Sequence, residues 1–297
     1  MTRRHRALPW LWKLPLCVAA LFIGQMLGLA LVSALGLELP SITTTADQST
    51  QTVLFVLAAI TITVALATVA AGLAGRWWVR GTILAGFLFV VYGVGNTIET
   101  SVFTTLGGEA ALIAMHLPPS VLVGLLVALL VAAPSDGHLR EGARAFFASW
   151  TPTRLAVRLG LAVLAFPGVY FLFGLMVAPI VTPYYDRLNF LVIPPFSTMV
   201  QVVLARSVLF LLVSLPVIIA WRASRGRLIL ALSLGHFVAL GLAGLLQATF
   251  FPPTLRLAHG VEILGASVCY AVALVWLLFP PPSRVEAQQP ALRERLA

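Results

Sequence analysis

The chain has 297 residues, of which 60% are hydrophobic and only 10% are charged, and its formal net charge is +9. Its mean hydropathy is +1.00. A soluble protein of this length must cover its surface with polar groups, so the composition excludes a soluble fold and indicates a membrane protein. The basic residues stand in short clusters between apolar runs, which is typical of membrane topology and lipid headgroup contact and not of nucleic-acid binding.

Eight apolar segments are each long enough to cross about 30 Å of hydrocarbon as a helix. The first follows a basic stretch, but it is too long for the core of a signal peptide and more apolar segments follow it. We therefore predict an all-α polytopic membrane protein. The predicted spans lie at about residues 9–36, 51–75, 80–105, 110–133, 155–182, 197–221, 227–250 and 257–279.

The positions of Lys and Arg orient the predicted spans. Of the 19 basic residues, sixteen lie in connections on one side, Arg187 and Arg256 lie on the other, and Arg206 lies within the sixth span. Because basic residues concentrate in cytoplasmic connections, we predict that both termini are cytoplasmic. The short connections favour a bacterial inner membrane.

The predicted spans divide the chain into two four-helix halves, residues 1–133 and 155–280, joined by a cytoplasmic linker at 134–154 and followed by a cytoplasmic tail at 281–297. The linker predicts an amphipathic helix that lies in the inner membrane interface. Ser135 and Asp136 are candidate caps for it. Its apolar residues at helical spacing are Leu139, Ala143, Phe146, Phe147 and Trp150, and its polar face holds Arg140, Glu141 and Arg144.

The two halves resemble each other in sequence. The segments STQTVLFVLAA and STMVQVVLARS open the second and sixth spans, and RGTILA and RGRLILA open the third and seventh. LIAMH and LRLAH end at His116 and His259, and the three pairs are offset by 148, 145 and 143 residues. The nearly constant offset predicts a duplicated four-helix unit with parallel repeats about an axis along the membrane normal. Convergent apolar composition is the alternative.

Polar side chains within the spans gather at one predicted depth. Ionisable groups inside a membrane are costly and usually face a bundle interior or a watery cavity. At about 1.5 Å per residue, the groups in question lie about 5–12 Å below the outer boundary. We predict that they line one outward-facing site for a substrate. The candidate substrate-binding residues are Asn96, Glu99, His116, Arg206, Gln247, His259 and Glu262.

Arg206 is the residue on which this prediction depends, because a guanidinium among apolar neighbours needs a partner. Glu99 and Glu262 are the carboxylates at matching depth, and we predict that Arg206 pairs with at least one of them. An ion pair that only fixes helix packing is the alternative to a ligand site. The outer connection at 182–196 is a candidate lid, and Tyr184 and Tyr185 within it are also typical of an interfacial aromatic belt.

Two further features of the spans predict packing. His236 lies near the middle of the seventh span, and we expect a carbonyl or hydroxyl to satisfy it in place of a proton relay or haem role. Gly24 and Gly28 match the GxxxG spacing that lets membrane helices approach closely.

The sequence supports three hypotheses of function. The chain lacks a Walker A sequence and an HExxH motif, and we predict no cofactor and no metal. The leading hypothesis is a transporter or permease for a small solute, an ion or a lipid, with membrane lipids and a small-molecule or ion ligand as partners. The first alternative is an intramembrane enzyme, metal-assisted or carboxylate-based, that acts on lipid or peptide. The second is a non-catalytic membrane subunit or sensor.

Overall fold

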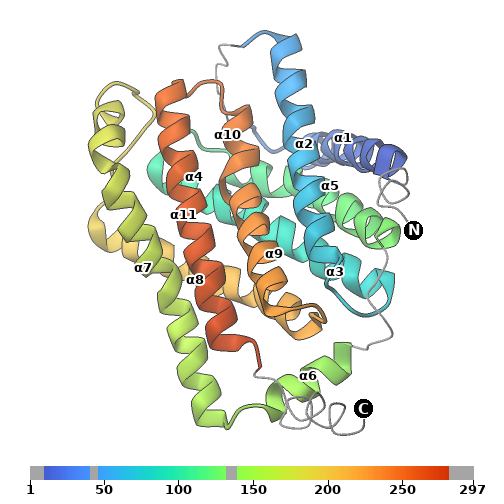
Figure 1. Cartoon of the computed structure of the whole chain (residues 1–297). Coiled ribbons are helices and arrows are strands. Elements are labelled where there is room, and N and C mark those ends of the chain that lie inside the picture. The colour runs from blue at the N-terminus through green and yellow to red at the C-terminus, as the bar shows by residue number, and fades with distance from the viewer. Residues whose placement is uncertain (1–9, 41–45, 132–138, 281–297) are drawn as a thin grey trace, which may run out of the picture.

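The computed structural model describes residues 10–40, 46–131 and 139–280, and this part of the chain is helical without a strand. Eight helical segments in it are long and apolar enough to cross a membrane, which confirms the predicted all-α polytopic fold. Their bounds agree with the predicted spans to within a few residues. The segments are Trp12–Ala34 (within α1, Trp10–Ala34), Gln48–Ala70 (α2), Trp77–Phe103, Glu109–Leu130 (α5), Pro152–Tyr185 (α7), Phe196–Ala220 (α8), Arg225–Gln247 and Pro253–Leu278 (α11) (Figure 1).

The third and seventh spans are each interrupted by a π-helical segment. The third consists of α3 (Trp77–Leu88), a π-helical turn at Phe89–Gly95 and α4 (Asn96–Phe103). The seventh consists of α9 (Arg225–Phe237), a π-helical turn at Val238–Leu242 and α10 (Ala243–Gln247). Such bulges are rare within α-helices and frequent at functional sites. Both interruptions are centred in the C-terminal half of their span.

The fifth span is the longest helix of the chain. Its 34 residues would reach about 51 Å, well beyond the hydrocarbon thickness. It carries Pro167, Pro179 and Pro183 within its length, and proline removes a helical hydrogen bond. The helix begins three residues before the predicted bounds of 155–182 and ends three residues after them, so it continues into the predicted outer connection.

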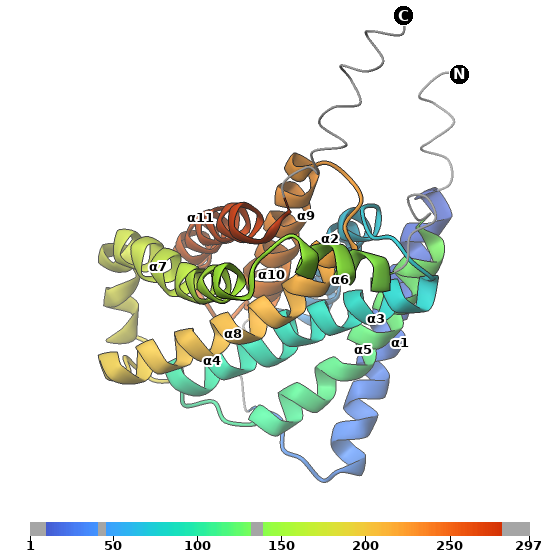
Figure 2. The same ribbon diagram turned by 90° about the horizontal axis from the view of Figure 1, so that it is seen from below.

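The helices of the first half pack in the same pairs as those of the second half. α1 packs against α5, and α7 packs against α11; α3 also packs against α5, as α9 does against α11. The second helix of each half also packs against the other half, since α2 contacts α9 and α8 contacts α3. Figure 2 shows the pair α7 and α11 on one side of the bundle and the pair α1 and α5 on the other.

A reciprocal pair of backbone hydrogen bonds joins the halves where α2 and α8 end. The Ala74 amide donates to the Ala220 carbonyl over 3.0 Å, and the Arg222 amide donates to the Gly72 carbonyl over 2.9 Å. Donors and acceptors both differ by 148 residues (222 − 74 and 220 − 72), which is one of the offsets seen in the sequence. The backbone contacts of one half therefore recur in the other at matching positions.

Basic side chains close the ends of the fourth helix in each half. Lys13 donates to the Leu130 carbonyl at the end of α5, and Arg158 donates to the Leu277 carbonyl at the end of α11. Arg80 and Arg225 donate to further carbonyls of the same two helix ends. A cation at a helix C-terminus is favourable because the last carbonyls lack intrahelical partners.

The close helix packing predicted at Gly24 and Gly28 is tested by the neighbours of each glycine. A Cβ on Gly24 would lie 2.3 Å from the Pro119 Cα, and one on Gly28 would lie 2.2 Å from the Met115 carbonyl oxygen. Neither glycine tolerates a side chain against α5, so the GxxxG prediction of close packing is confirmed.

The predicted linker helix is present as α6 (Leu139–Ala148). It contacts α8, and Phe146 is buried in the main core while Phe147 is 56% exposed. The predicted apolar face thus divides between protein contact and an exposed side. The candidate caps Ser135 and Asp136, and the predicted tail at 281–297, lie outside the described residues.

Candidate functional site

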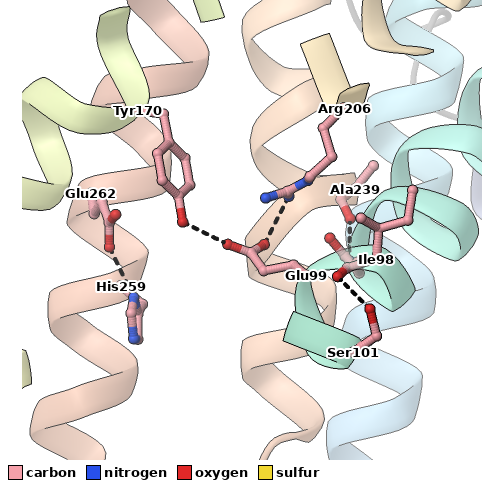
Figure 3. Close-up of polar contacts among 9 residues, drawn as sticks. Ile98, Glu99, Ser101, Tyr170, Arg206, Ala239, His259 and Glu262 are labelled. Carbon is pink, nitrogen blue, oxygen red and sulfur yellow. Dashed lines mark hydrogen bonds and ion pairs between the residues drawn. The ribbon is translucent and has the colours of Figure 1, made fainter. Parts of the chain in front are cut away.

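Arg206 on α8 pairs with Glu99 on α4, as predicted. The Arg206 side chain is 2% exposed, and its Nη2 lies 2.7 Å from Glu99 Oε2 (Figure 3). α8 presents Arg206 between Phe166 and Phe210, whose ring centroids lie 5.8 and 5.5 Å from the guanidinium carbon. The cation is therefore enclosed by aromatic rings and held by one carboxylate.

Most of the hydrogen-bonding capacity of Arg206 is unused. Its Nε and Nη1 atoms are buried and have no hydrogen-bond partner among the described residues. A guanidinium carries five N–H donors, and a buried donor without an acceptor is costly. The site therefore presents cationic donors that fit an acceptor supplied from outside the chain.

Glu99 is the exposed member of the pair. Its side chain is 34% exposed, in contrast to the enclosed Arg206. The Tyr170 hydroxyl on α7 donates to Glu99 Oε1 over a long 3.4 Å contact. Glu99 sits on α4, just beyond the π-helical turn, and Asn96 on the same helix donates to the Ala239 carbonyl in the other π-helical turn over 3.0 Å. The two interruptions thus hold the helix that carries Glu99.

His259 and Glu262 on α11 form a second pair on the far side of Tyr170. The His259 Nδ1 lies 2.8 Å from Glu262 Oε2, and the two side chains are 27% and 13% exposed. In Figure 3 the Tyr170 hydroxyl lies between Glu99 and Glu262, and both carboxylates act electrostatically on it. We refer to Arg206, Glu99, Tyr170, His259 and Glu262 together as the Arg206 centre.

The predicted lid is anchored beside this centre. Tyr185, the last residue of α7, packs against the buried cluster of Val181, Leu255 and Ala258. Beyond it, the Thr105 amide donates to the Phe190 carbonyl and the Val192 amide donates to the Phe103 carbonyl, each over 2.9 Å. The connection is thus tied to the end of α4, while its opening and closing stay a prediction.

The predicted single layer of polar residues is divided in two, which corrects the sequence interpretation. Arg206, Glu99, His259 and Glu262 come together, but His116 and Gln247 lie elsewhere. The His116 ring packs on the Tyr92 ring with centroids 4.7 Å apart, and Gln247 Nε2 donates to the Tyr92 hydroxyl over 3.2 Å. Asn96 lies on the helix of Glu99 but points its amide at the seventh span. Equal depth did not imply contact, because the residues lie on different sides of the bundle.

Tyr170 is the member of the centre that sequence reasoning missed. It lies in the apolar run FPGVYFLFG, where the neighbouring Phe residues disguise a phenol as one more core aromatic. The one available signal was its hydroxyl, a polar group at a depth where the other members had already been identified.

His236 is a closed, satisfied contact in the middle of the bundle. It is fully buried, its Nδ1 donates to the Leu232 carbonyl over 2.9 Å, and its Nε2 lies 3.3 Å from the Ser214 hydroxyl. The rings of Phe87, Phe210 and Tyr270 surround it. The expected carbonyl and hydroxyl partners are confirmed.

Neither a metal-binding cluster in the described residues nor a known relative identifies the chain. Within residues 10–40, 46–131 and 139–280, no group of three or more His, Cys, Asp or Glu side chains is arranged to hold a metal ion. No protein-family model matches the chain, and no curated protein or solved structure matches it.

Proposed function

We propose that the chain is a membrane permease that binds a polar ligand at the Arg206 centre. One observation carries the proposal: Arg206 is 2% exposed and two of its nitrogens lack a partner among the described residues, while its carboxylate partner is one-third exposed. A pair that only fixed helix packing would be expected to use its donors within the protein, since an unmet buried donor is destabilising. The unpaired donors of Arg206 and the part-exposed carboxylate of Glu99 together suit a ligand.

The chemistry of the centre favours a ligand with both an anionic and a cationic group. The planar donors of Arg206 match a carboxylate or a phosphate. Glu99 and Glu262 supply carboxylates for an ammonium group, with the Tyr170 hydroxyl between them. Such a zwitterion has two sources, a free solute and the headgroup of a zwitterionic lipid.

Either source has an approach to the centre. Glu99 lies near the end of α4 and His259 near the beginning of α11, at the predicted outer ends of both helices. α7 and α11 also carry apolar side chains directed away from the bundle, such as Leu175 at 74% exposed and Leu257 at 70% exposed, which fit lipid. Below the centre the enclosed His236 closes the route, so transport requires a second conformation. The π-helical turns are the sites where we expect the helices to rearrange.

The cellular setting belongs to the same proposal. We propose a bacterial inner membrane because the connections are short, and cytoplasmic termini because of the distribution of basic residues. Its partners are membrane lipids and the small ligand, and nucleic acid has no part.

One observation favours an enzyme as the second candidate. The His259 and Glu262 side chains lie 2.8 Å apart, and a carboxylate that orients an imidazole is a recurring general-base arrangement. The metal-assisted form of this candidate lacks a group of three ligands among the described residues. A third candidate, a non-catalytic subunit or sensor, gives no use for the free donors of Arg206.

A counterflow experiment tests the permease. Purified protein in liposomes would be loaded in turn with glycine betaine, phosphoethanolamine, acetate or choline, and exchange with labelled external compound would be measured. A second arm would follow the flipping of fluorescent phosphatidylethanolamine, which distinguishes a lipid from a free solute. Arg206→Leu is compared with Arg227→Leu, a matched change at an exposed arginine of the predicted inner side.

We expect wild-type protein and Arg227→Leu to exchange a zwitterion in one arm, and Arg206→Leu to lose at least about tenfold of the rate, since hydrogen bonds to charged groups contribute about 1.5–3 kcal/mol. Unimpaired exchange by folded Arg206→Leu, or no exchange by wild type in either arm, would contradict the proposal. A covalent change in lipid or peptide that His259→Ala abolishes would favour the enzyme.

A further inference from the structure

A separate cavity lies on the other side of the bundle, between α1, α2, α5 and α10. Its volume is about 80 Å³. Apolar side chains, among them Phe55, form much of its wall, and five polar side chains project into the same space. The polar lining residues are Gln25, Tyr92, His116, Ser120 and Gln247.

A wider hollow of about 300 Å³ adjoins this cavity and shares Phe55 and Gln247 with it. Its other polar walls are Gln48, Gln51 and Thr52, at the beginning of α2. This end of α2 is predicted to face the outer side. The two spaces therefore form a funnel with a polar mouth and a narrow inner end.

The cavity corresponds to the Arg206 centre in the other half of the chain. In the 148-residue register of the reciprocal hydrogen bonds, Arg206 matches Ala58 (206 − 58). Glu99 and Gln247 lie in α4 and α10, the short helices that follow the two π-helical turns. The Arg206 centre places the tip of the third span against α7, α8 and α11, while the cavity places the tip of the seventh span against α1, α2 and α5. The cavity therefore has an arrangement of helices like that of the Arg206 centre, but the described residues that line it form no ion pair.

The polar groups of the cavity are able to bind a further hydrogen-bonding molecule. The His116 Nδ1 is buried without a partner among the described residues. Gln247 uses its Nε2 on Tyr92 and on the Ala243 carbonyl, and no hydrogen bond is recorded for its Oε1. Amide, phenol, imidazole and hydroxyl groups together offer both donors and acceptors.

We infer that this funnel is a second binding site, for a small uncharged solute that carries hydroxyl or amide groups. Among the described residues that line either space there is no Asp, Glu, Lys or Arg. A charged ligand would lose its hydration here without a counter-charge, which is costly, whereas an uncharged one exchanges water for the lining groups. The inner end fits the polar tip of the solute, and the wider hollow fits the rest. The inference rests on the cavity alone and is independent of the Arg206 centre.

Cysteine accessibility tests the site in the full chain. In a parent with Cys17→Ala and Cys269→Ala, we would introduce Gln25→Cys or, deeper, Ser120→Cys, and measure modification by uncharged, anionic and cationic methanethiosulfonates of similar size. Ser267→Cys is the matched control, because Ser267 is a serine of the eighth span that is as buried as Ser120 and does not line the cavity. Glycerol and acetamide are the uncharged probes for protection.

We expect the uncharged reagent to modify Gln25→Cys or Ser120→Cys at least about tenfold faster than either charged reagent, because placing a charge at such a depth costs about 2.5 kcal/mol or more. Glycerol or acetamide should slow that reaction, and Ser267→Cys should not react. Equal rates for charged and uncharged reagents, no reaction at both cavity positions of folded protein, or no protection by either probe would overturn the inference.

A charge placed at Gln247 tests the selectivity separately. Gln247→Glu, added to the reactive cysteine variant, gives the cavity the carboxylate that Glu99 provides in the other half. We expect the cationic reagent to become the fastest of the three. An unchanged order of rates would show that the uncharged lining does not select the ligand.

Discussion

Arg80 and Arg206 are both 2% exposed arginines within membrane spans. The Nε of Arg80, like that of Arg206, has no hydrogen-bond partner among the described residues, but the remaining nitrogens of the two side chains differ in their partners. Arg80 donates from Nη1 to the Ala128 carbonyl over 3.2 Å, and from Nη2 to the Ala70 and Val131 carbonyls, each over 2.9 Å. Arg206 has a single ion pair with the part-exposed Glu99, and two of its nitrogens are unpaired. The first arginine completes the ends of α2 and α5, and the second leaves two buried nitrogens without a partner among the described residues.

The difference teaches how a structural arginine is told from a functional one in a membrane protein. Burial is the same for both side chains, although Arg80 lies near the end of its span and Arg206 near the middle. The partners of the guanidinium distinguish the two roles. Backbone carbonyls at helix ends are fixed in place and always need donors. An exposed carboxylate is able to exchange its partner for a ligand or water. His236 has a structural role like that of Arg80, because the Leu232 carbonyl and the Ser214 hydroxyl satisfy its two ring nitrogens.

The largest expected effect is a loss of stability in Arg80→Leu. Three helix-end carbonyls would lose a donor, and we expect the free energy of unfolding to fall by about 3 kcal/mol, since each buried unmet acceptor costs about 1 kcal/mol or more. Arg206→Leu should change the same quantity by less than about 1 kcal/mol, because the Glu99 carboxylate that it leaves behind is one-third exposed and can be solvated. Unfolding in detergent micelles measures both, with Arg227→Leu as the neutral control. Equal losses for Arg80→Leu and Arg206→Leu would remove the distinction between them.

The smallest expected effect is that of Tyr170→Phe. Its hydroxyl makes a 3.4 Å contact with a carboxylate that is one-third exposed, so its removal should cost less than about 0.5 kcal/mol of stability. The same change should lower the affinity for a zwitterion, which the concentration dependence of counterflow would report. A large loss of stability without an effect on affinity would assign Tyr170 to packing.

The sequence predicted the fold well because length and hydropathy are local properties of each span. It also predicted that Arg206 pairs with Glu99 or Glu262, since a deeply placed guanidinium had only these two candidate carboxylates. It could not predict the choice between them, which depends on the π-helical turn that orients α4. The same holds for the role of Arg80, which was counted only as a basic residue of the inner side.

The sequence interpretation was wrong in placing His116 and Gln247 with Arg206. Residue spacing gives depth along each helix, but it does not give the side of the bundle on which a helix stands. The side on which each helix stands depends on the contacts that α2 and α8 make with the other half. Gln247 lies at a cavity beside Tyr92 and His116. The structure places Glu99 and Gln247 in the short helices that follow the two π-helical turns, α4 and α10, and the sequence did not reveal these turns.

The coupling energy between Arg206 and Glu99 tests most directly whether their centre is open to a ligand. A double-mutant cycle would compare the unfolding free energies of wild type, Arg206→Leu, Glu99→Gln and the double variant without ligand. An exposed carboxylate is already solvated, so we predict a coupling below about 1 kcal/mol. A coupling of about 3 kcal/mol or more, as for a closed buried pair, would show that these residues hold the helices together and would contradict the account.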